Sequence, residues 1–434
     1  MSLQKSLMSL HRLITASAIL LMVIFAACKK EKTTEQATII QLITAKTSIS
    51  KTEPLSLTLP ASVPKGAIVK WKLIPSDSTT LTDSVYKVTI SAKKPGQYLV
   101  IAILNGDSLH KYEKVITVTD VAYQPGQQRL KAITLVRTGQ TYLNLNAAVN
   151  AAITNDSIEI PAGLYTNDFV NINKSLTIVG IGGMAHFIAT IAPPNGKAIF
   201  LANADIKLDH IEMSGSAVAD MNGAGIKQET GNLTLTYCYF HDNQDGVLTN
   251  AVTTGITVTN CEFAHNGAGD GYSHNIYIGA TAQAVIRSSY FHDAVVGHEI
   301  KCRALNSLIE MCRIQNGSGS ASYCIDLPQG GAAIVRQNFI EKGQNAQNPT
   351  VIHYGGEAVN QGSSLQVSSN TVLVLKAGDT FVNNQMADGT TALLSNNSVF
   401  GLTDNLMLAG MGSVLGTVHL GTQPAVDRSS LFHL

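Results

Sequence analysis

The sequence predicts an all-β protein in which a right-handed parallel β-helix follows a small immunoglobulin-like β-sandwich. Three observations support the β-helix. An eleven-residue pattern recurs eight times between Ile206 and Val399. Its apolar residues often lie two apart, which places them on the same side of a strand. The units are short, strand-rich and poor in helical periodicity, as expected of a solenoid built from β-strands.

Each repeat is apolar at offsets 0, +2 and +7 from its first residue, and it carries a small, apolar or amide residue at +5. The step from +2 to +5 predicts a bend between two short strands. The repeats begin at Ile206, Leu233, Ile256, Ala284, Ser307, Ala332, Leu365 and Ala392. Their +5 residues are Ile211, Cys238, Cys261, Ser289, Cys312, Gln337, Asn370 and Asn397.

The +5 column predicts ladders of like residues inside the solenoid. Stacked coils place equivalent residues about 4.8 Å apart, so amides can hydrogen-bond along the stack. We interpret Cys238, Cys261 and Cys312 as packing groups, because one column does not make metal ligands converge. In-register neighbours suit a disulfide poorly, so no disulfide framework is expected.

The N-terminus has the features of a secretory signal over residues 1–27. A positively charged start and a short apolar run precede small residues and Cys28, as in a cleaved signal peptide. The arrangement resembles a bacterial lipoprotein signal, which implies lipid on Cys28 and a polar tether over residues 28–37. The lipid would anchor the chain to the membrane without spanning it. Because Lys29 follows, we expect an outer membrane-anchored protein in the periplasm or on the cell surface; an ordinary secretion signal or an uncleaved anchor is the alternative.

Charge is balanced and scarce. Lysine plus arginine and aspartate plus glutamate number 30 each, and 14% of the residues are charged. A nucleic-acid-binding protein usually carries a basic patch or stripe. We therefore expect no nucleic-acid partner, and we expect a monomer.

Residues 38–120 show short alternating strands with turn signals. Trp71 lies on a predicted central strand and Tyr98 enters a later one. This arrangement resembles an immunoglobulin-like sandwich. No cysteine pair occurs in the segment, so the resemblance is to a bacterial module of that shape, with spacing or weak binding as its expected role.

The β-helix is expected over residues 128–434, after a short linker. Its start combines helical spacing from Leu145 to Ala152 with the strands Asp156–Tyr165 (DSIEIPAGLY) and Lys174–Gly180 (KSLTIVG). A solenoid needs its open end covered. This start resembles the capped beginning of the pectin-lyase-like superfamily, and the resemblance extends over residues 128–400. It implies the right-handed parallel β-helix fold; members of that superfamily are mostly polysaccharide lyases and hydrolases, with some non-catalytic surface proteins.

Three consecutive coils carry a concentration of polar residues, with the sequences SHNIYI, GHEIKCR and SYCIDL. If Ile276, Ile300 and Ile325 point inward, the others are placed by parity. The predicted sets are an outward column of Tyr277, Lys301 and Asp326, a second outward column of Asn275, Glu299 and Cys324, and a corner stack of His274, His298 and Tyr323. Arg303 would project beside Lys301, and His353 would approach Asp326. A slip of one residue would reverse every side chain, and an ion-pair ladder without function is the structural alternative.

These residue types suit a polysaccharide lyase. β-Elimination from a uronic acid needs its carboxylate neutralised, a base and an acid. Arg303 would neutralise the carboxylate, Lys301 would be the base, and Tyr277, Tyr323 or His298 would be the acid. The remaining predicted substrate-binding residues are His274, Asn275, Glu299, Asp326 and His353.

Two other function classes stay open. An inverting glycoside hydrolase could use Glu299 and Asp326, expected about 7–8 Å apart, although the Asn-Thr-Asp strand and Asp-Asp pair of β-helix galacturonases are missing. A non-catalytic glycan-binding surface protein would need no such pair, but the aromatic residues (6%) form no outward stripe. No cofactor is certain. A Ca²⁺ ion could bind with help from Asp270 and Asp293, and the glycine-rich segment 266–272 is expected to form a rim loop.

Overall fold

The computed structural model describes residues 38–41, 48–50, 55–59, 68–74, 79–84, 87–92, 96–104, 107–119 and 132–432. The chain divides into two compact units, residues 1–123 and 124–434. The predicted signal peptide, the tether and Cys28 lie outside the described residues. Within the described part of the chain, no helix is long and apolar enough to cross a membrane.

The described strands of the first unit form two sheets. One contains β1 (Thr38–Gln41), β2 (Ser48–Ser50), β4 (Val69–Ile74), β7 (Gly96–Leu104) and β8 (Asp107–Thr119). The other contains β3 (Leu55–Thr58), β5 (Thr79–Ser84) and β6 (Lys87–Ala92). Trp71 is buried on β4. Among the described strands β4 pairs only with β7 and lies at the edge of its sheet, not at the predicted central position. The immunoglobulin-like assignment stays a prediction.

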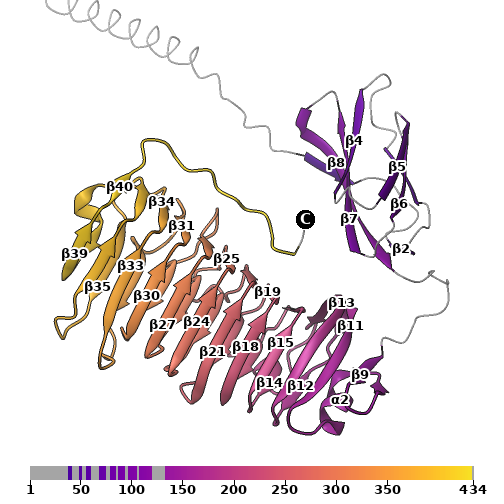
Figure 1. Ribbon diagram of the computed structural model, residues 1–434, viewed down its shortest axis with the longest axis horizontal. Helices are drawn as coiled ribbons and strands as arrows, with labels where there is room; N and C mark the ends of the chain where they lie inside the picture. The colour runs from indigo at the N-terminus through magenta and orange to yellow at the C-terminus, as the bar shows by residue number, and fades with distance from the viewer. Residues whose placement is uncertain are drawn as a thin grey trace, which may run out of the picture. The chain divides into compact units, whose positions relative to one another are not determined.

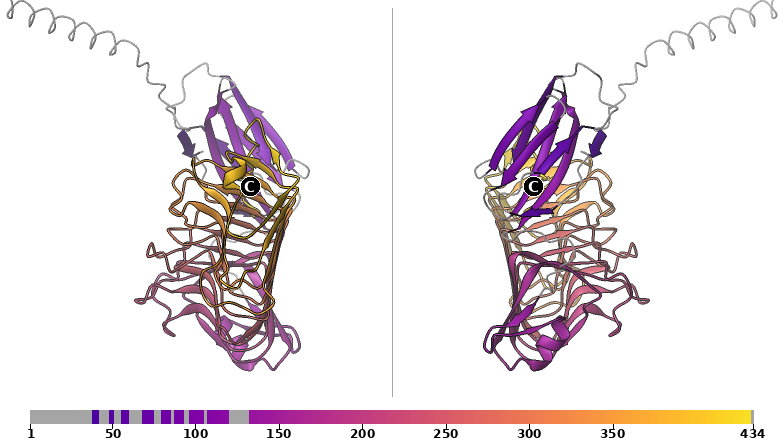
Figure 2. Two further views of the ribbon diagram at one scale, coloured as in Figure 1. Left: turned by 90° about the vertical axis from the view of Figure 1, so that its left-hand side faces the viewer. Right: turned by 90° about the vertical axis from the view of Figure 1, so that its right-hand side faces the viewer.

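The second unit is a parallel β-helix, as predicted from the repeats, and each coil has three faces. Figure 1 shows its strands stacked side by side, and Figure 2 gives views toward its two ends. Two long strands, β11 (Asp156–Thr166) and β13 (Leu176–Ile188), begin the stack and each run through faces 1 and 2.

Face 1 continues as β15 (Ile206–Asp209), β18 (Gly231–Thr236), β21 (Thr253–Thr259), β24 (Gln283–Arg287), β27 (Asn306–Glu310), β30 (Ala332–Arg336), β33 (Ser364–Ser368), β36 (Ala392–Ser395) and β39 (Gly412–Leu415). Face 2 continues as β16 (Ile211–Ser214), β19 (Tyr239–His241), β22 (Glu262–Ala264), β25 (Tyr290–His292), β28 (Arg313–Gln315), β31 (Phe339–Lys342), β34 (Thr371–Val374), β37 (Ser398–Phe400) and β40 (Val418–His419).

Face 3 is a ten-stranded sheet. Its strands are β12 (Val170–Ile172), β14 (Ala198–Ala202), β17 (Ala224–Gln228), β20 (Asp245–Thr249), β23 (Ile276–Ile278), β26 (Ile300–Cys302), β29 (Ile325–Leu327), β32 (Thr350–Gly355), β35 (Thr380–Gln385) and β38 (Leu408–Ala409). This face carries the three polar coils singled out in the sequence.

A left-handed corner residue separates face 1 from face 2 in all eight repeats. These residues have φ between 48° and 56°, and they are His210, Tyr237, Asn260, Ser288, Met311, Gln337, Ser369 and Asn396. Few non-glycine residues adopt this region, and here it turns the chain so that the next side chain points inward. The corner explains the step from +2 to +5 in the sequence pattern.

The predicted register of the sixth repeat is wrong by one residue. Ser307 pairs with Ala333 rather than Ala332, so the inward residue after the corner is Asn338 and not Gln337. Asn338 is buried, whereas Gln337 is the exposed corner residue. The error arises because Ile334 and Phe339 also fit an apolar pattern, although they are only half-buried outward neighbours of Val335 and Ile340.

The core follows the predicted columns elsewhere. Phe240, Phe263 and Phe291 stack with ring centroids 5.1 and 4.7 Å apart. The described cysteines, which are Cys238, Cys261, Cys302, Cys312 and Cys324, are all free and buried, as expected of packing groups. The amide ladder continues from Asn338 through Asn370 to Asn397, with side-chain Nδ2–Oδ1 distances of 3.0 Å.

The N-terminal end of the solenoid is covered, whereas β39 and β40 at the other end are exposed. The hairpin of β9 (Ile133–Leu135) and β10 (Gln140–Tyr142) and the helix α2 (Leu145–Ala151) lie at its start, and α2 buries Leu145, Ala148 and Val149 as predicted. A short 3-10 helix, η1 (Asp404–Leu406), and β38 to β40 lie at the other end. Beyond them, the chain runs back along face 2, where Arg313 donates to the backbone oxygens of Asp427 and Ser429.

Candidate functional site

The outward column of face 3 confirms the predicted alignment of Tyr277, Lys301 and Asp326. His353 extends this column on the next strand, beside Asp326. On the other side, Leu248 and then Lys227 occupy the same column on β20 and β17. The regular strand spacing therefore sets a line of polar side chains across the face, interrupted only by Leu248.

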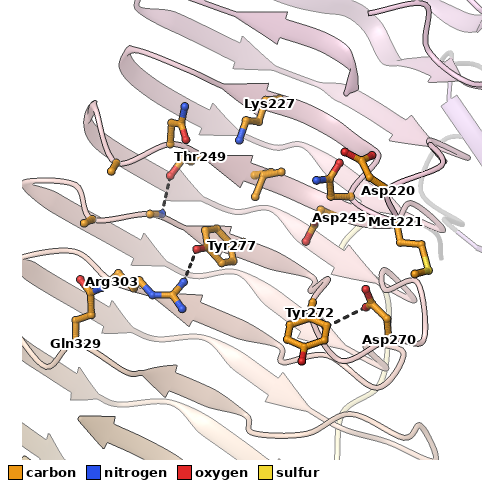
Figure 3. Close-up of a pocket in the computed structure, with 16 residues that line it drawn as sticks. Asp220, Met221, Lys227, Asp245, Thr249, Asp270, Tyr272, Tyr277, Arg303 and Gln329 are labelled. Atoms are coloured by element: carbon orange, nitrogen blue, oxygen red, sulfur yellow. Dashed lines mark hydrogen bonds between the residues drawn. The ribbon is translucent and has the colours of Figure 1, made fainter. Parts of the chain in front are cut away.

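A groove of about 530 Å³ lies over β17, β20 and β23. Figure 3 shows Lys227, Tyr277 and Arg303 along it. Asp270 and Tyr272 also line it, so the glycine-rich segment forms the expected rim. Lys301, in contrast, does not line this groove.

The guanidinium of Arg303 contacts both Tyr277, which lines the groove, and the carboxylate of Glu357. Its Nη1 donates to the hydroxyl of Tyr277, and its Nε and Nη2 donate to the two carboxylate oxygens of Glu357, each at 2.7 Å. The Arg303 Cζ lies 5.0 Å from the centre of the Tyr277 ring. Burial raises the pKa of Tyr277, and the Arg303 charge opposes that rise. The phenol is therefore held in a fixed position beside a fixed cation.

Three basic side chains surround the carboxylate of Asp326. Lys301 Nζ and His298 Nε2 each lie 3.3 Å from its Oδ2, and His353 Nδ1 lies 2.7 Å from its Oδ1. Burial disfavours the charged carboxylate, but the hydrogen bond from His353 and the nearby His298 and Lys301 outweigh it, so the pKa of Asp326 is lowered. Although its side chain is on the outward column, Asp326 is only 2% exposed. Asp326 therefore positions Lys301, His298 and His353, and it is too buried to be a main ligand contact.

The predicted aromatic stack at the corner is present. Ring centroids are 4.7 Å apart for His274 and His298, 5.0 Å for His298 and Tyr323, and 4.8 Å for Tyr323 and His353. The backbone N–H groups of His298 and Tyr323 donate to Nδ1 of His274 and His298. These bonds make Nδ1 an acceptor in both rings, so the proton of each neutral ring is on Nε2.

The two buried histidines differ in what their Nε2–H meets. Burial lowers the pKa of both His274 and His298 well below the usual value, so both are neutral at pH 7. His298 Nε2 lies beside Asp326, but His274 Nε2 is buried without a hydrogen-bond partner among the described residues. The His274 ring stacks on that of Tyr277, which lines the groove, with ring centroids 5.8 Å apart.

The prediction that Asn275, Glu299 and Cys324 point outward is wrong. All three have no exposed surface. The strands of face 3 begin one residue later, at Ile276, Ile300 and Ile325, so strand parity does not apply to the corner residues before them. These side chains turn into the coil.

Glu299 is part of a polar network inside the coil. Its Oε2 accepts from Asn275 Nδ2 at 2.5 Å, and its Oε1 accepts from Asn316 Nδ2 at 3.1 Å and from Ala294 N at 3.3 Å. Burial raises the pKa of Glu299 to about 7. An interior Glu299 cannot flank a glycan together with Asp326, so that pair does not form a hydrolase site.

The sequence interpretation missed four charged residues around the groove. Asp220, Lys227 and Asp245 line it, and Glu357 holds Arg303. Burial lowers the pKa of Lys227 and raises that of Asp245 well above the usual value. Lys227 could have been found by extending the outward column two coils toward the N-terminus. Asp220 and Asp245 lie outside that column, and Glu357 gave no signal, since its partner is 54 residues away.

Asp270 and Asp293 do not form one cation site. Asp270 lines the groove, where its Oδ1 accepts from Ser273 Oγ at 2.9 Å. Asp293 lines a separate depression with Glu341 and Arg428. A Ca²⁺ ion shared by these two carboxylates is therefore not supported by their positions.

Comparisons with known proteins agree with the fold. A family model described as "Right handed beta helix region" matches residues 210–414, so the solenoid is a right-handed parallel β-helix. No curated protein matches the sequence.

Three solved structures are similar to this chain. ORF18 of Geobacillus virus E2 has 13% identity and a TM-score of 0.47, over 74% of this chain and 66% of that chain. An alginate lyase from Paenibacillus has 16% identity and a TM-score of 0.42, over 64% of this chain and 95% of that chain. The family 28 exopolygalacturonase of Yersinia enterocolitica has 11% identity and a TM-score of 0.33, over 88% and 86%.

Proposed function

We propose that the groove binds an acidic polysaccharide and that the protein is a lyase acting on uronic acid residues. The observation that carries the proposal is the Tyr277 hydroxyl, which lies in an open groove against the guanidinium of Arg303. Lys227 lines the same groove. A proton donor, a cation that neutralises the carboxylate and a base are the groups that β-elimination next to a carboxylate requires.

The proposed reaction uses these residues in separate roles. Arg303 neutralises the uronate carboxylate and so stabilises the negative charge that develops on it. Lys227, whose pKa burial lowers, takes the proton from the carbon next to the carboxylate. The electron pair left behind forms the carbon–carbon double bond, and the bond to the glycosidic oxygen breaks. Tyr277 gives its proton to that oxygen.

The spacing of the column fits this assignment. Lys227 and Tyr277 are on either side of Leu248 in register, which separates their backbones by two strand spacings, or about 9.6 Å. A sugar ring fits between side chains that far apart. In this proposal Lys301, predicted as the base, instead holds Asp326 as an ion pair, and His298 and Tyr323 support the column.

The test is a panel of uronic-acid and neutral polysaccharides, followed by ultraviolet absorbance for unsaturated products and by reducing-end assays. We expect new absorbance with a uronate polymer, and a loss of about 10²-fold or more in Tyr277→Phe and Arg303→Ala. The matched controls are Tyr237→Phe and Arg287→Ala, outside the groove-lining residues, which should keep full activity. Equal activity in Tyr277→Phe and the wild type would contradict the proposed acid.

An inverting glycoside hydrolase is the second candidate, because of Asp245. This carboxyl lines the groove and burial raises its pKa, as a general acid requires. Asp220 and Asp270 line the same groove and could supply a base. Reducing ends without ultraviolet absorbance, lost in Asp245→Asn, would favour this reading; binding without either product would favour a glycan-binding protein.

The proposed location follows from the N-terminal sequence. We propose that lipid on Cys28 anchors the chain to the outer membrane, so that the groove meets polysaccharide in the periplasm or outside the cell. The signal-like run before Cys28 supports this proposal.

A further inference from the structure

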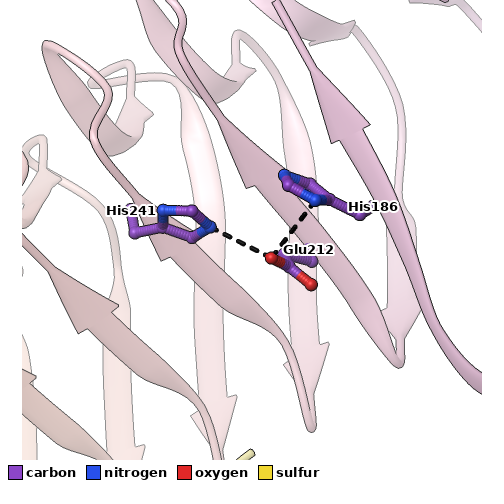
Figure 4. Close-up of side chains that lie close together, drawn as sticks. All are labelled: His186, Glu212 and His241. Atoms are coloured by element: carbon purple, nitrogen blue, oxygen red, sulfur yellow. Dashed lines mark hydrogen bonds and ion pairs between the residues drawn. The ribbon is translucent and has the colours of Figure 1, made fainter. Parts of the chain in front are cut away.

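Face 2 carries a cluster of three ligand-type side chains, apart from the groove described above. His186, Glu212 and His241 come from β13, β16 and β19, which are consecutive strands of the stack. Figure 4 shows both imidazoles pointing toward the carboxylate. Among the described residues, it is the one group of three or more such side chains whose ligand atoms all lie within 4.8 Å of one another.

The distances fit the edges of a tetrahedral metal site. His186 Nδ1 and His241 Nε2 lie 3.3 and 3.1 Å from the same carboxylate oxygen, Oε1 of Glu212. Metal–ligand bonds of 2.0–2.1 Å in a tetrahedron give ligand–ligand distances of about 3.3 Å. The two imidazole nitrogens lie within 4.8 Å of each other.

The outward nitrogens are oriented as they are in metal-binding histidines. His241 Nδ1 lies 2.7 Å from Asp242 Oδ2, and His186 Nε2 lies 2.7 Å from Ser214 Oγ. A metal-bound histidine normally hydrogen-bonds a carboxylate or another oxygen through its second nitrogen, which fixes the tautomer. Both ring nitrogens of His241 face carboxylate oxygens, Nδ1 toward Asp242 and Nε2 toward Glu212, so a cation on Nε2, either a second proton or a metal ion, is favourable there.

A proton could supply that cation at one histidine, as the neighbouring group illustrates. Two coils further on, His292 repeats the geometry with Glu262 Oε1 at 3.2 Å and Asp293 Oδ2 at 2.8 Å. There a single imidazole meets the glutamate. At Glu212 two imidazoles share one oxygen, with ring centroids 5.6 Å apart, and protonating both would place two positive charges side by side.

We propose that His186, Glu212 and His241 bind one first-row divalent transition metal ion, with Zn²⁺ as the best fit. Two imidazoles and one carboxylate are ligands that zinc accepts, whereas Ca²⁺ and Mg²⁺ prefer oxygen ligands alone. The side chains of the three residues are 11% to 21% exposed, so the ion can enter from solvent. Three protein ligands leave the fourth tetrahedral position to water.

The experiment titrates Zn²⁺ into the full chain without an affinity tag, against a chromogenic chelator, and records thermal melts with and without the metal. We expect one competing Zn²⁺ per chain and a higher melting temperature with Zn²⁺ but not with Ca²⁺. His241→Ala and His186→Ala should each weaken binding at least tenfold. Glu212→Gln is the milder variant, in case either alanine variant fails to fold by circular dichroism.

His292→Ala is the matched control, because it removes an imidazole with the same local geometry two coils away. It should bind Zn²⁺ as tightly as the wild type. The proposal is overturned if wild type and His241→Ala bind Zn²⁺ equally, if neither binds it, or if His292→Ala loses as much affinity as His241→Ala. None of these outcomes depends on glycan turnover, so the metal site and the proposed lyase activity are tested separately.

Discussion

Replacing Asn370 by leucine tests the buried amide ladder between faces 1 and 2. Asn370 Oδ1 accepts from the backbone N–H and the Nδ2 of Asn338, each at 3.0 Å. Its own Nδ2 donates to Val335 O and to Asn397 Oδ1, also at 3.0 Å. Leucine has a similar size but makes none of these four bonds.

The expected cost follows from the groups that lose their partners. The buried N–H of Asn338 loses its acceptor, and Val335 O loses a donor, at about 1–3 kcal/mol each. Burying the leucine side chain returns about 1.5–3 kcal/mol. From the middle of these ranges, the free energy of unfolding should fall by about 2 kcal/mol.

Guanidinium denaturation followed by circular dichroism measures the change, and hydrogen exchange of the peptide around Asn338 gives a local measure. Gln366→Leu is the matched control: it replaces an exposed amide on the neighbouring strand β33 and should change stability by less than about 0.5 kcal/mol. If Asn370→Leu is as stable as this control, and the Asn338 amide exchanges no faster, the ladder does not stabilise the coil as argued.

Three further predictions concern packing, pH and anchoring. Ile300→Ala should lower stability by about 2–5 kcal/mol because it empties a fully buried site, whereas Ile334→Ala, on the outward side, should cost less than about 1 kcal/mol; equal costs would contradict the register. In the folded protein the pKa of Glu299 is raised from 4.5 to about 7. The contribution of Glu299 to stability is therefore fully present below pH 4.5 and is lost as the pH rises through 7. Relative to Glu299→Gln, the wild type should lose about 3 kcal/mol over that window, and parallel pH profiles of unfolding would refute this. Cys28→Ala should abolish lipidation and membrane partitioning; a variant with unchanged lipid mass by mass spectrometry would show that the anchor is elsewhere.

Much of the solenoid could be predicted because its repeats are local. Apolar residues two apart determine which side of a strand faces inward, and the same offsets recur coil after coil. The predictions were wrong at corner residues, where strand alternation does not apply. Gln337 and Asn338 are adjacent at a left-handed corner, and only the pairing of Ser307 with Ala333 decides which one turns inward. Asn275 and Glu299 precede their strands, so their direction follows from the corner and not from strand alternation.

The sequence by itself determined the right-handed parallel β-helix, its capped start and the alignment of Tyr277, Lys301 and Asp326. Each of these depends on short-range periodicity and on the constant spacing of stacked strands. Only the tertiary structure decided that Asp326 is enclosed, that Glu357 holds Arg303, and that His186 and His241 converge on Glu212. These contacts join residues 25 to 54 positions apart in the chain, and loop lengths that differ between coils decide which side chains meet.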